Sequence, residues 1–147
     1  MTRPTYENTS DRSAETVAVQ KFIKSFGGEV DFIKLPLQYK MDFALTRNGV
    51  ITALVEVKCR RNKKHAYPTY MISMSKLVAA AGYRNIGINC ILLVQWADGM
   101  GWVQMSNEDW SVRVGGRKDR NDWQDIEPVT HIPISEFKDV IKVEDER

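Results

Sequence analysis

The sequence predicts an α/β fold in which helices flank a mixed central sheet. Helical and strand periodicities alternate along the chain in the order helix, three strands, helix, two strands. The length of 147 residues suits a single domain, 1–147, with a core at about 10–105 and an extension at 107–147. A hydrophobic share of 43% and a charged share of 27% are typical of globular proteins and exclude a wholly disordered chain.

The first element is a helix from Ser10 or Ser13 to Phe26, because both serines are good N-caps and Gly27-Gly28 provides a stop. Its apolar stripe has helical spacing and consists of Ala18, Val19, Phe22 and Phe26. Glu15 falls on the same stripe. Its carboxylate either turns inward, which is costly without a partner, or lies in the first turn, where it favours the helix dipole and touches water.

Three strands follow, at about 30–35, 39–46 and 50–59. Asn48-Gly49 separates the last two, and this dipeptide between alternating runs is typical of a β-hairpin. The segment 60–70 is basic and aromatic, and we expect it to be a loop. Ser73 or Ser75 then begins a second helix, which we expect to run to about Ala81 and to end at Gly82.

Residues 88–96 form a continuous apolar run, which is typical of a strand buried on both faces. The Asp98-Gly99 turn leads into a strand at 101–105. The polar stretch 107–127 has the character of a long loop. A strand at 131–134 and a short helix beginning at Ser135 complete the extension, with Phe137, Val140 and Ile141 facing inward.

The chain carries a net charge of only +2, but its cations are clustered. One group comprises Lys58, Arg60, Arg61, Lys63 and Lys64, and a second comprises Arg113, Arg117, Lys118 and Arg120. Such clusters form either an anion-binding face or a solvated loop.

The two cysteines have no disulfide or metal-site pattern, the N-terminus has no signal-peptide character, and no apolar run approaches the roughly 20 residues of a membrane span. We therefore expect a cytoplasmic protein.

The strand at 50–59 ends in an unusual pair, Glu56 and Lys58, which share one face about 6.6 Å apart along the strand. The pair is either a solvent-facing ion pair or part of a site that includes Asp42 on the preceding strand. A two-residue Asn48-Gly49 loop puts Asp42 opposite Val55 and turns Glu56 to the other face. A three-residue loop with a bulge puts Asp42 opposite Leu54, on the face of Glu56. A bulge or an irregular loop is therefore a prediction of the functional interpretation.

On a shared face, Asp42 and Glu56 would offer carboxylate oxygens, and Glu15 could approach from the first helix. Hard oxygen ligands suit Mg²⁺ or Mn²⁺, whereas zinc would favour His or Cys. Lys58 beside such an ion could orient a water molecule, lower its pKa or stabilise charge on a phosphate.

The order of Glu15 on a helix, Asp42 on a strand and Glu56-Val57-Lys58 on the next strand resembles the PD-(D/E)xK nuclease superfamily. The spacing is similar to that of archaeal-type Holliday junction resolvases and small phage-borne nucleases. The resemblance covers about residues 10–105 and implies the restriction-endonuclease-like α-β-β-β-α-β core. Met41 stands where the motif has proline, and the resemblance assigns nothing to the segment from Asn107 onward.

The resemblance implies a divalent-metal-dependent endonuclease that acts on DNA, including branched DNA, and forms a two-fold homodimer. Asp42, Glu56, the Val57 carbonyl and Glu15 would bind Mg²⁺ or Mn²⁺, and Lys58 would be the catalytic lysine. We expect basic residues to hold the DNA backbone: Arg60, Arg61, Lys63, Lys64, Lys76, Arg117, Lys118 and Arg120. The alternatives are a nuclease-like module that binds nucleic acid without cutting it, and a structural α/β domain with a surface ion pair.

Overall fold

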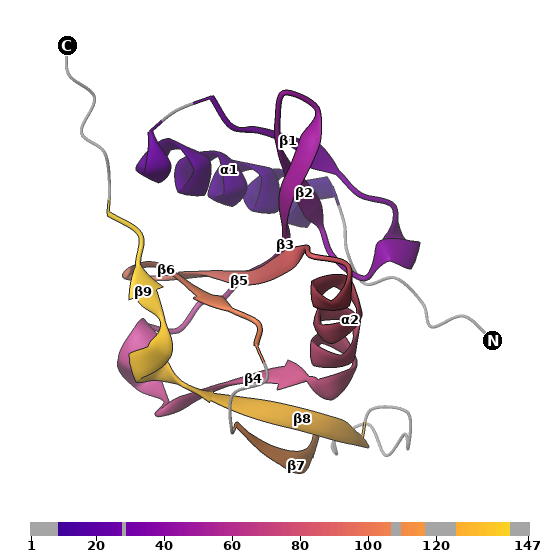
Figure 1. Cartoon of the computed structure of the whole chain (residues 1–147). Coiled ribbons are helices and arrows are strands. Elements are labelled where there is room, and N and C mark those ends of the chain that lie inside the picture. The colour runs from indigo at the N-terminus through magenta and orange to yellow at the C-terminus, as the bar shows by residue number, and fades with distance from the viewer. Residues whose placement is uncertain (1–8, 28, 107–109, 117–125, 142–147) are drawn as a thin grey trace.

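The computed structural model describes residues 9–27, 29–106, 110–116 and 126–141, and these carry two sheets and two α-helices (Figure 1). The first sheet has the strand order β1-β2-β3-β5-β6-β9. Its strands are β1 (Asp31–Lys34), β2 (Phe43–Arg47), β3 (Val50–Cys59), β5 (Asn89–Trp96), β6 (Gly99–Gln104) and β9 (Lys138–Asp139). The pair β3–β5 is parallel and every other pair is antiparallel, so the predicted mixed sheet is confirmed.

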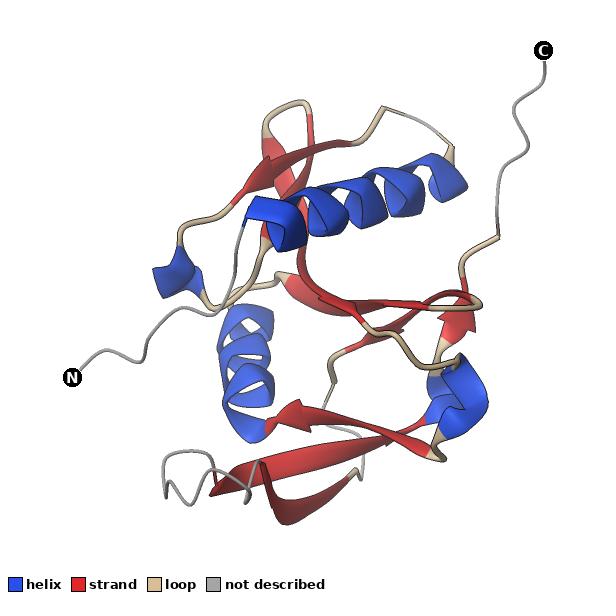
Figure 2. Cartoon of the chain, turned by 180° about the vertical axis from the view of Figure 1, so that it is seen from behind, coloured by secondary structure: helices blue, strands red, loops and turns tan. Residues whose placement is uncertain are grey.

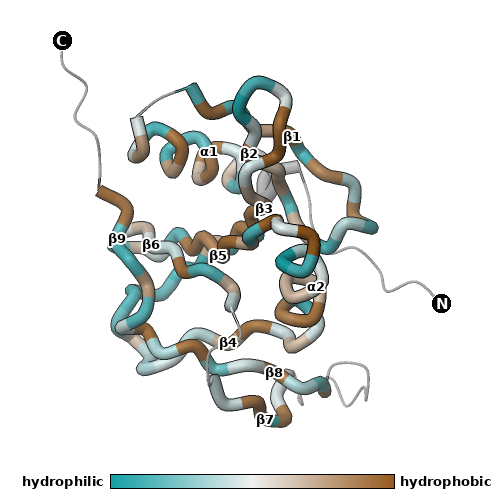
Figure 3. The backbone as a smooth tube through the Cα atoms, viewed as in Figure 1, coloured by the Kyte–Doolittle hydropathy of each residue, from teal (hydrophilic) through white to brown (hydrophobic). Residues whose placement is uncertain are grey.

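The two helices cover opposite faces of this sheet (Figures 1 and 2). Helix α1 (Thr9–Phe26) packs its buried residues Ala18, Val19 and Phe22 onto odd-numbered side chains of β3 such as Val55. Helix α2 (Met74–Asn85) lies on the other side, where Leu54 joins a second core. The apolar colouring of β3 and β5 in Figure 3 reflects their central position between these two cores.

A second, three-stranded sheet closes the core on the α2 side, and sequence patterns missed most of it. It consists of β4 (Thr69–Ser73), β8 (Ile126–Pro133) and β7 (Ser111–Gly116), in the order β4-β8-β7. The expected loop 107–127 therefore contains β7 and the start of β8, and the expected loop 60–70 ends two residues inside β4. The β4 strand buries Tyr70 and Ile72, while Met71 between them is exposed. Five alternating residues in a basic context are too short a signal to separate from a loop.

The first helix and the hairpin agree with expectation, whereas several boundaries differ. Gly27 adopts a positive φ of 58° after α1, as its stop role requires. Phe26 is 52% exposed, although its ring still contacts Phe22. Helix α2 takes Ser73 as its N-cap and continues through Gly82 to Asn85, so the predicted end at Gly82 is wrong. Isolated glycine weakens a helix by only about 1 kcal/mol, which packing overrides.

The predicted C-terminal helix is also wrong. Ile134–Glu136 form a single 3-10 turn, and the chain then adds β9 to the edge of the first sheet. Phe137 is buried as expected, but Ile141 is 79% exposed. Within the described ranges, no helix is long and apolar enough to cross a membrane.

Candidate metal and phosphate site

The β2–β3 hairpin sets the register on which the site depends. Asn48 and Gly49 both have positive φ, 52° and 78°, and they form a two-residue loop that pairs Arg47 with Val50. The three-residue loop is therefore wrong. The expected bulge is present, because Thr46 pairs with Ile51 and Leu45 pairs with Ala53, which leaves Thr52 without a partner in the ladder. The bulge places Phe43, rather than Asp42, opposite Val55.

This shift lets Asp42 flank Glu56 at the point where β2 begins. The Asp42 backbone N–H donates to the Val55 carbonyl at 2.9 Å. Its carboxylate oxygen Oδ2 accepts the Val57 N–H at 2.8 Å. Asp42 is thus bonded to the residues on both sides of Glu56, through its backbone to Val55 and through its carboxylate to Val57.

Glu56 lies on the α2 face of β3 and is 3% exposed. Two lysines neutralise it from different elements. Lys58, on the same strand face, places Nζ 3.5 Å from Oε1, and Lys76 of α2 places Nζ 3.1 Å from Oε2. Lys76 also donates to the Lys40 carbonyl at 2.6 Å. The buried carboxylate is therefore held between a strand and a helix.

Glu15 reaches the site from the opposite face of the sheet, through Lys34. The Lys34 ammonium lies 3.7 Å from Glu15 Oε2 and 3.4 Å from Asp42 Oδ1. Sequence reasoning missed Lys34, because a single lysine in a short strand carries no signal; only the pairing of Lys34 with Phe43 brings it beside Asp42. Among the described residues, no three His, Cys, Asp or Glu side chains form a ready metal cluster.

Glu56 is the acidic residue of the site whose pKa is shifted by its surroundings. Burial raises the pKa of the Glu56 carboxyl above its ordinary value of 4.5, and the Asp42 charge raises it further. Lys58 and Lys76 act in the opposite direction and only partly offset this rise. A cation held between the two neighbouring carboxylates would lower the electrostatic cost of burying Glu56 in its charged form.

A divalent ion fits this donor set. Mg²⁺ in proteins takes one or two carboxylates and completes its shell with water and phosphate oxygens. Asp42 and Glu56 supply the carboxylates. The Val57 N–H points toward Asp42, and since the carbonyl of a strand residue points to the same side as its N–H, the Val57 carbonyl can supply a third oxygen. Glu15 would act through water or through Lys34.

The residues expected to hold DNA differ in their surroundings, and one of them, Lys76, is the partner of Glu56 described above. Arg60, Arg61 and Lys63 are exposed in the loop after β3. Lys64 is not, because its ammonium lies 2.8 Å from Asp139 Oδ1 and its side chain is only 14% exposed. Lys64 therefore ties the loop to β9. Arg113 lies on β7, while Arg117, Lys118 and Arg120 lie outside the described residues.

Comparison with known proteins gives one family and one fold. The family described as "Phage putative PDDEXK endonuclease" matches residues 1–140. No curated protein matches the sequence significantly. Among solved structures, that of Archaeoglobus fulgidus Hjc, a Holliday junction resolvase from an archaeal hyperthermophile, superposes with a TM-score of 0.57 at 11% identity. The alignment covers 90% of this chain and 93% of that one, which shows the restriction-endonuclease-like fold.

Proposed function

The chain belongs to the phage PDDEXK endonuclease family, and on this premise we propose that it hydrolyses DNA phosphodiester bonds with the help of Mg²⁺ or Mn²⁺. The observation that carries the proposal is the bulged hairpin, which brings Asp42 beside the buried Glu56, whose other neighbour on the strand face is Lys58. A purely structural ion pair would lie at the surface. Burying Glu56 beside a second carboxylate raises the pKa of Glu56 and so destabilises its charged form, which a structural role does not require.

In this proposal Asp42, Glu56 and the Val57 carbonyl hold the ion. When bound, the ion polarises the scissile phosphate and makes a water molecule more acidic. The Val57 N–H fixes the orientation of Asp42, and Lys34 holds the same carboxylate from the other side. Lys58, whose side chain is 36% exposed, can leave Glu56 and place its ammonium against the charge that develops on the phosphate.

The exposed cations after β3 support a DNA substrate. Arg60, Arg61 and Lys63 continue directly from the catalytic strand, so a backbone held by them would pass over Lys58. We propose that branched DNA is among the substrates, since the likeness to a Holliday junction resolvase covers most of the chain. We further propose a homodimer, as the same resemblance implies, and a cytoplasmic site of action, which the small number of cysteines and their lack of a disulfide-framework spacing support.

A cleavage assay tests the proposal. Labelled linear duplex, single strand, flap and four-way junction are offered with Mg²⁺, Mn²⁺ or EDTA. We expect cutting that requires the ion and is lost in Glu56→Gln and in Lys58→Ala, with DNA binding retained in Lys58→Ala. Glu29→Ala, which removes an exposed carboxylate away from the site, is the matched control and should cut normally. Undiminished cutting by Lys58→Ala would remove this residue from the mechanism, and binding without cutting on every substrate would favour the non-catalytic module.

A further inference from the structure

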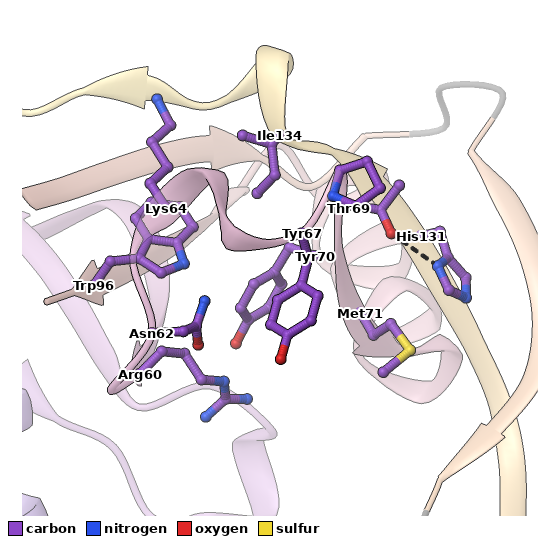
Figure 4. A pocket seen from close by; sticks show the side chains of 11 residues that line it. Arg60, Asn62, Lys64, Tyr67, Thr69, Tyr70, Met71, Trp96, His131 and Ile134 are labelled. Carbon is purple, nitrogen blue, oxygen red and sulfur yellow. Dashed lines mark hydrogen bonds between the residues drawn. The ribbon is translucent and has the colours of Figure 1, made fainter. Parts of the chain in front are cut away.

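A hollow of about 360 Å³ lies just beyond the carboxyl end of β3, next to the proposed catalytic site (Figure 4). Its size is at the lower end of the roughly 300–1,000 Å³ of small-molecule sites. The side chains that the inference uses are Arg60, Asn62, Tyr67, Tyr70 and Trp96. None of them has a role in the proposed metal site, so the hollow needs its own explanation.

The inner wall of the hollow is aromatic and rigid. Tyr70, Trp96 and Phe137 form a closed set of edge-on ring contacts, with centroids 5.2–6.3 Å apart. All three side chains are buried. The ring of Tyr67 stands at the rim and is 63% exposed. An exposed aromatic ring beside a fixed aromatic wall can stack a planar ligand at little conformational cost.

Polar groups converge on the same space. Figure 4 shows the Tyr67 and Tyr70 hydroxyls directed to the side on which the Arg60 guanidinium and the Asn62 amide lie. The guanidinium carbon of Arg60 lies 5.4 Å from the Tyr70 ring centroid. The Tyr70 hydroxyl is buried, and no hydrogen bond of good geometry reaches it from the part of the chain that the structure describes. A buried hydroxyl in this state is costly and is available to a ligand.

The hollow continues from the catalytic face. Glu56 and Lys58 lie about 6.6 Å apart on one side of β3, and Arg60 follows the last residue of the strand, where its N–H donates to the Gln95 carbonyl at 2.8 Å. Burial raises the pKa of Tyr70 to about 12, and the charge of Glu56 contributes to this rise while that of Arg60 opposes it. Tyr70 is therefore near Glu56, and a ligand in the hollow would lie next to a phosphate held at Lys58.

We propose that the hollow holds one unpaired base of the DNA strand that is cut. A base offers a flat face to Tyr67 and hydrogen-bonding edges to Arg60, Asn62 and the Tyr70 hydroxyl. A phosphate has no flat face that could stack on the aromatic rings. A base in a duplex is already stacked on its neighbours on both faces and cannot stack on Tyr67 as well. The substrate class is thus DNA with an unpaired nucleotide next to the cleaved bond. This inference rests on the proposed nuclease function, but its test measures binding and needs no cleavage.

The test compares two oligonucleotides of equal length and backbone charge, a short single-stranded oligothymidine and the same chain made of abasic nucleotides. Affinities are measured in EDTA with the whole protein, its Tyr67→Ala variant and its Tyr67→Phe variant. We expect the wild type to bind the base-containing strand about 5- to 150-fold more tightly, the range for one stacked base. Tyr67→Ala should lose most of this preference, and Tyr67→Phe, which keeps the ring, should retain it.

Equal binding of the two strands by the wild type would overturn the inference, and so would full preference in Tyr67→Ala. Unchanged affinity of Tyr67→Ala for the abasic strand, which reports the backbone contacts, would show that the loss belongs to the base. The outcome is separable from that of the cleavage assay. A protein that prefers bases but never cuts would refute the nuclease and keep the base pocket, whereas one that cuts without preferring bases would do the reverse.

Discussion

Replacing Lys76 with methionine tests the idea that this lysine holds the metal-binding carboxylate in the absence of metal. Methionine keeps the length of the side chain and removes the ammonium that lies 3.1 Å from Glu56 Oε2. Glu56 itself is 3% exposed, so it cannot turn to water for compensation. Lys58 at 3.5 Å is the cation that remains beside it among the ion pairs described above.

The expected loss of stability is about 2 kcal/mol. A hydrogen bond to a charged group contributes about 1.5–3 kcal/mol, while stranding one partner of a fully buried pair costs about 3–5 kcal/mol. The lower range applies here, because the Lys76 side chain is 25% exposed and Lys58 still neutralises part of the charge. For a chain of this size, about 2 kcal/mol corresponds to a fall in Tm of roughly 4–8 °C.

The assay is a double-mutant cycle by thermal or urea unfolding in EDTA, with Lys76→Met, Glu56→Gln and the double variant. Because the double variant has no buried charge to strand, it should recover most of the loss, and the coupling free energy should be about 2 kcal/mol. Lys21→Met, which removes an exposed lysine of α1, is the control and should stay within about 0.5 kcal/mol of wild type. A coupling near zero would refute the reasoning, since it would mean that water or Lys58 already satisfies Glu56.

Three further outcomes follow from the same geometry. The folded state raises the pKa of Glu56 above 4.5, so the folded protein binds this proton more tightly than the unfolded chain does. The free energy of unfolding in EDTA should therefore fall as pH rises above about 4.5. Urea unfolding at a series of pH values should show this slope in wild type and a smaller slope in Glu56→Gln. Thr52 is the extra residue of the bulge, so deleting it should leave the tight turn and the pairing of Leu45 with Ala53 unchanged. Metal-dependent cleavage should therefore persist. Loss of cleavage in a folded variant would give Thr52 a further role. Lys64→Ala should lower Tm by a few degrees, as expected for the loss of about 1 kcal/mol. It should leave DNA affinity in a filter-binding assay unchanged, since the Lys64 ammonium is paired with Asp139. A clear loss of affinity would show that Lys64 contacts DNA.

The sequence was enough to single out the residues of the candidate site, but it did not predict how they come together. Residue types and strand alternation are enough to single out Asp42, Glu56 and Lys58. Whether they meet depends on a one-residue shift of register, and neither the two-residue loop nor the bulge alone follows from the apolar pattern. Lys34 shows the same limit more strongly. It becomes a member of the site only through the pairing of β1 with β2, a contact that no local pattern encodes.

The second sheet was missed for a different reason. Its strand β4 ends at Ser73 and pairs with β8, which begins only at Ile126, rather than with a neighbour in the chain. Periodicity detects an element that buries one face by itself, whereas β7 leaves Val112 and Val114 largely exposed and so lacks the usual contrast. Because β4 carries Tyr70, a sequence prediction that misses this strand also misses the inner wall of the hollow proposed to hold a base.

The charge balance of the site links metal binding to DNA binding. Lys34, Lys58 and Lys76 face Glu15, Asp42 and Glu56 through the ion pairs described, so the metal-free site is close to neutral. A divalent ion adds two positive charges to this balance, at the place where the DNA phosphate would lie. Each ligand therefore favours the other, and the coupling must be equal in both directions. In the proposed mechanism the lysines neutralise the acidic side chains of the metal-free protein, and a bound ion would take over that role and leave the lysines for phosphate.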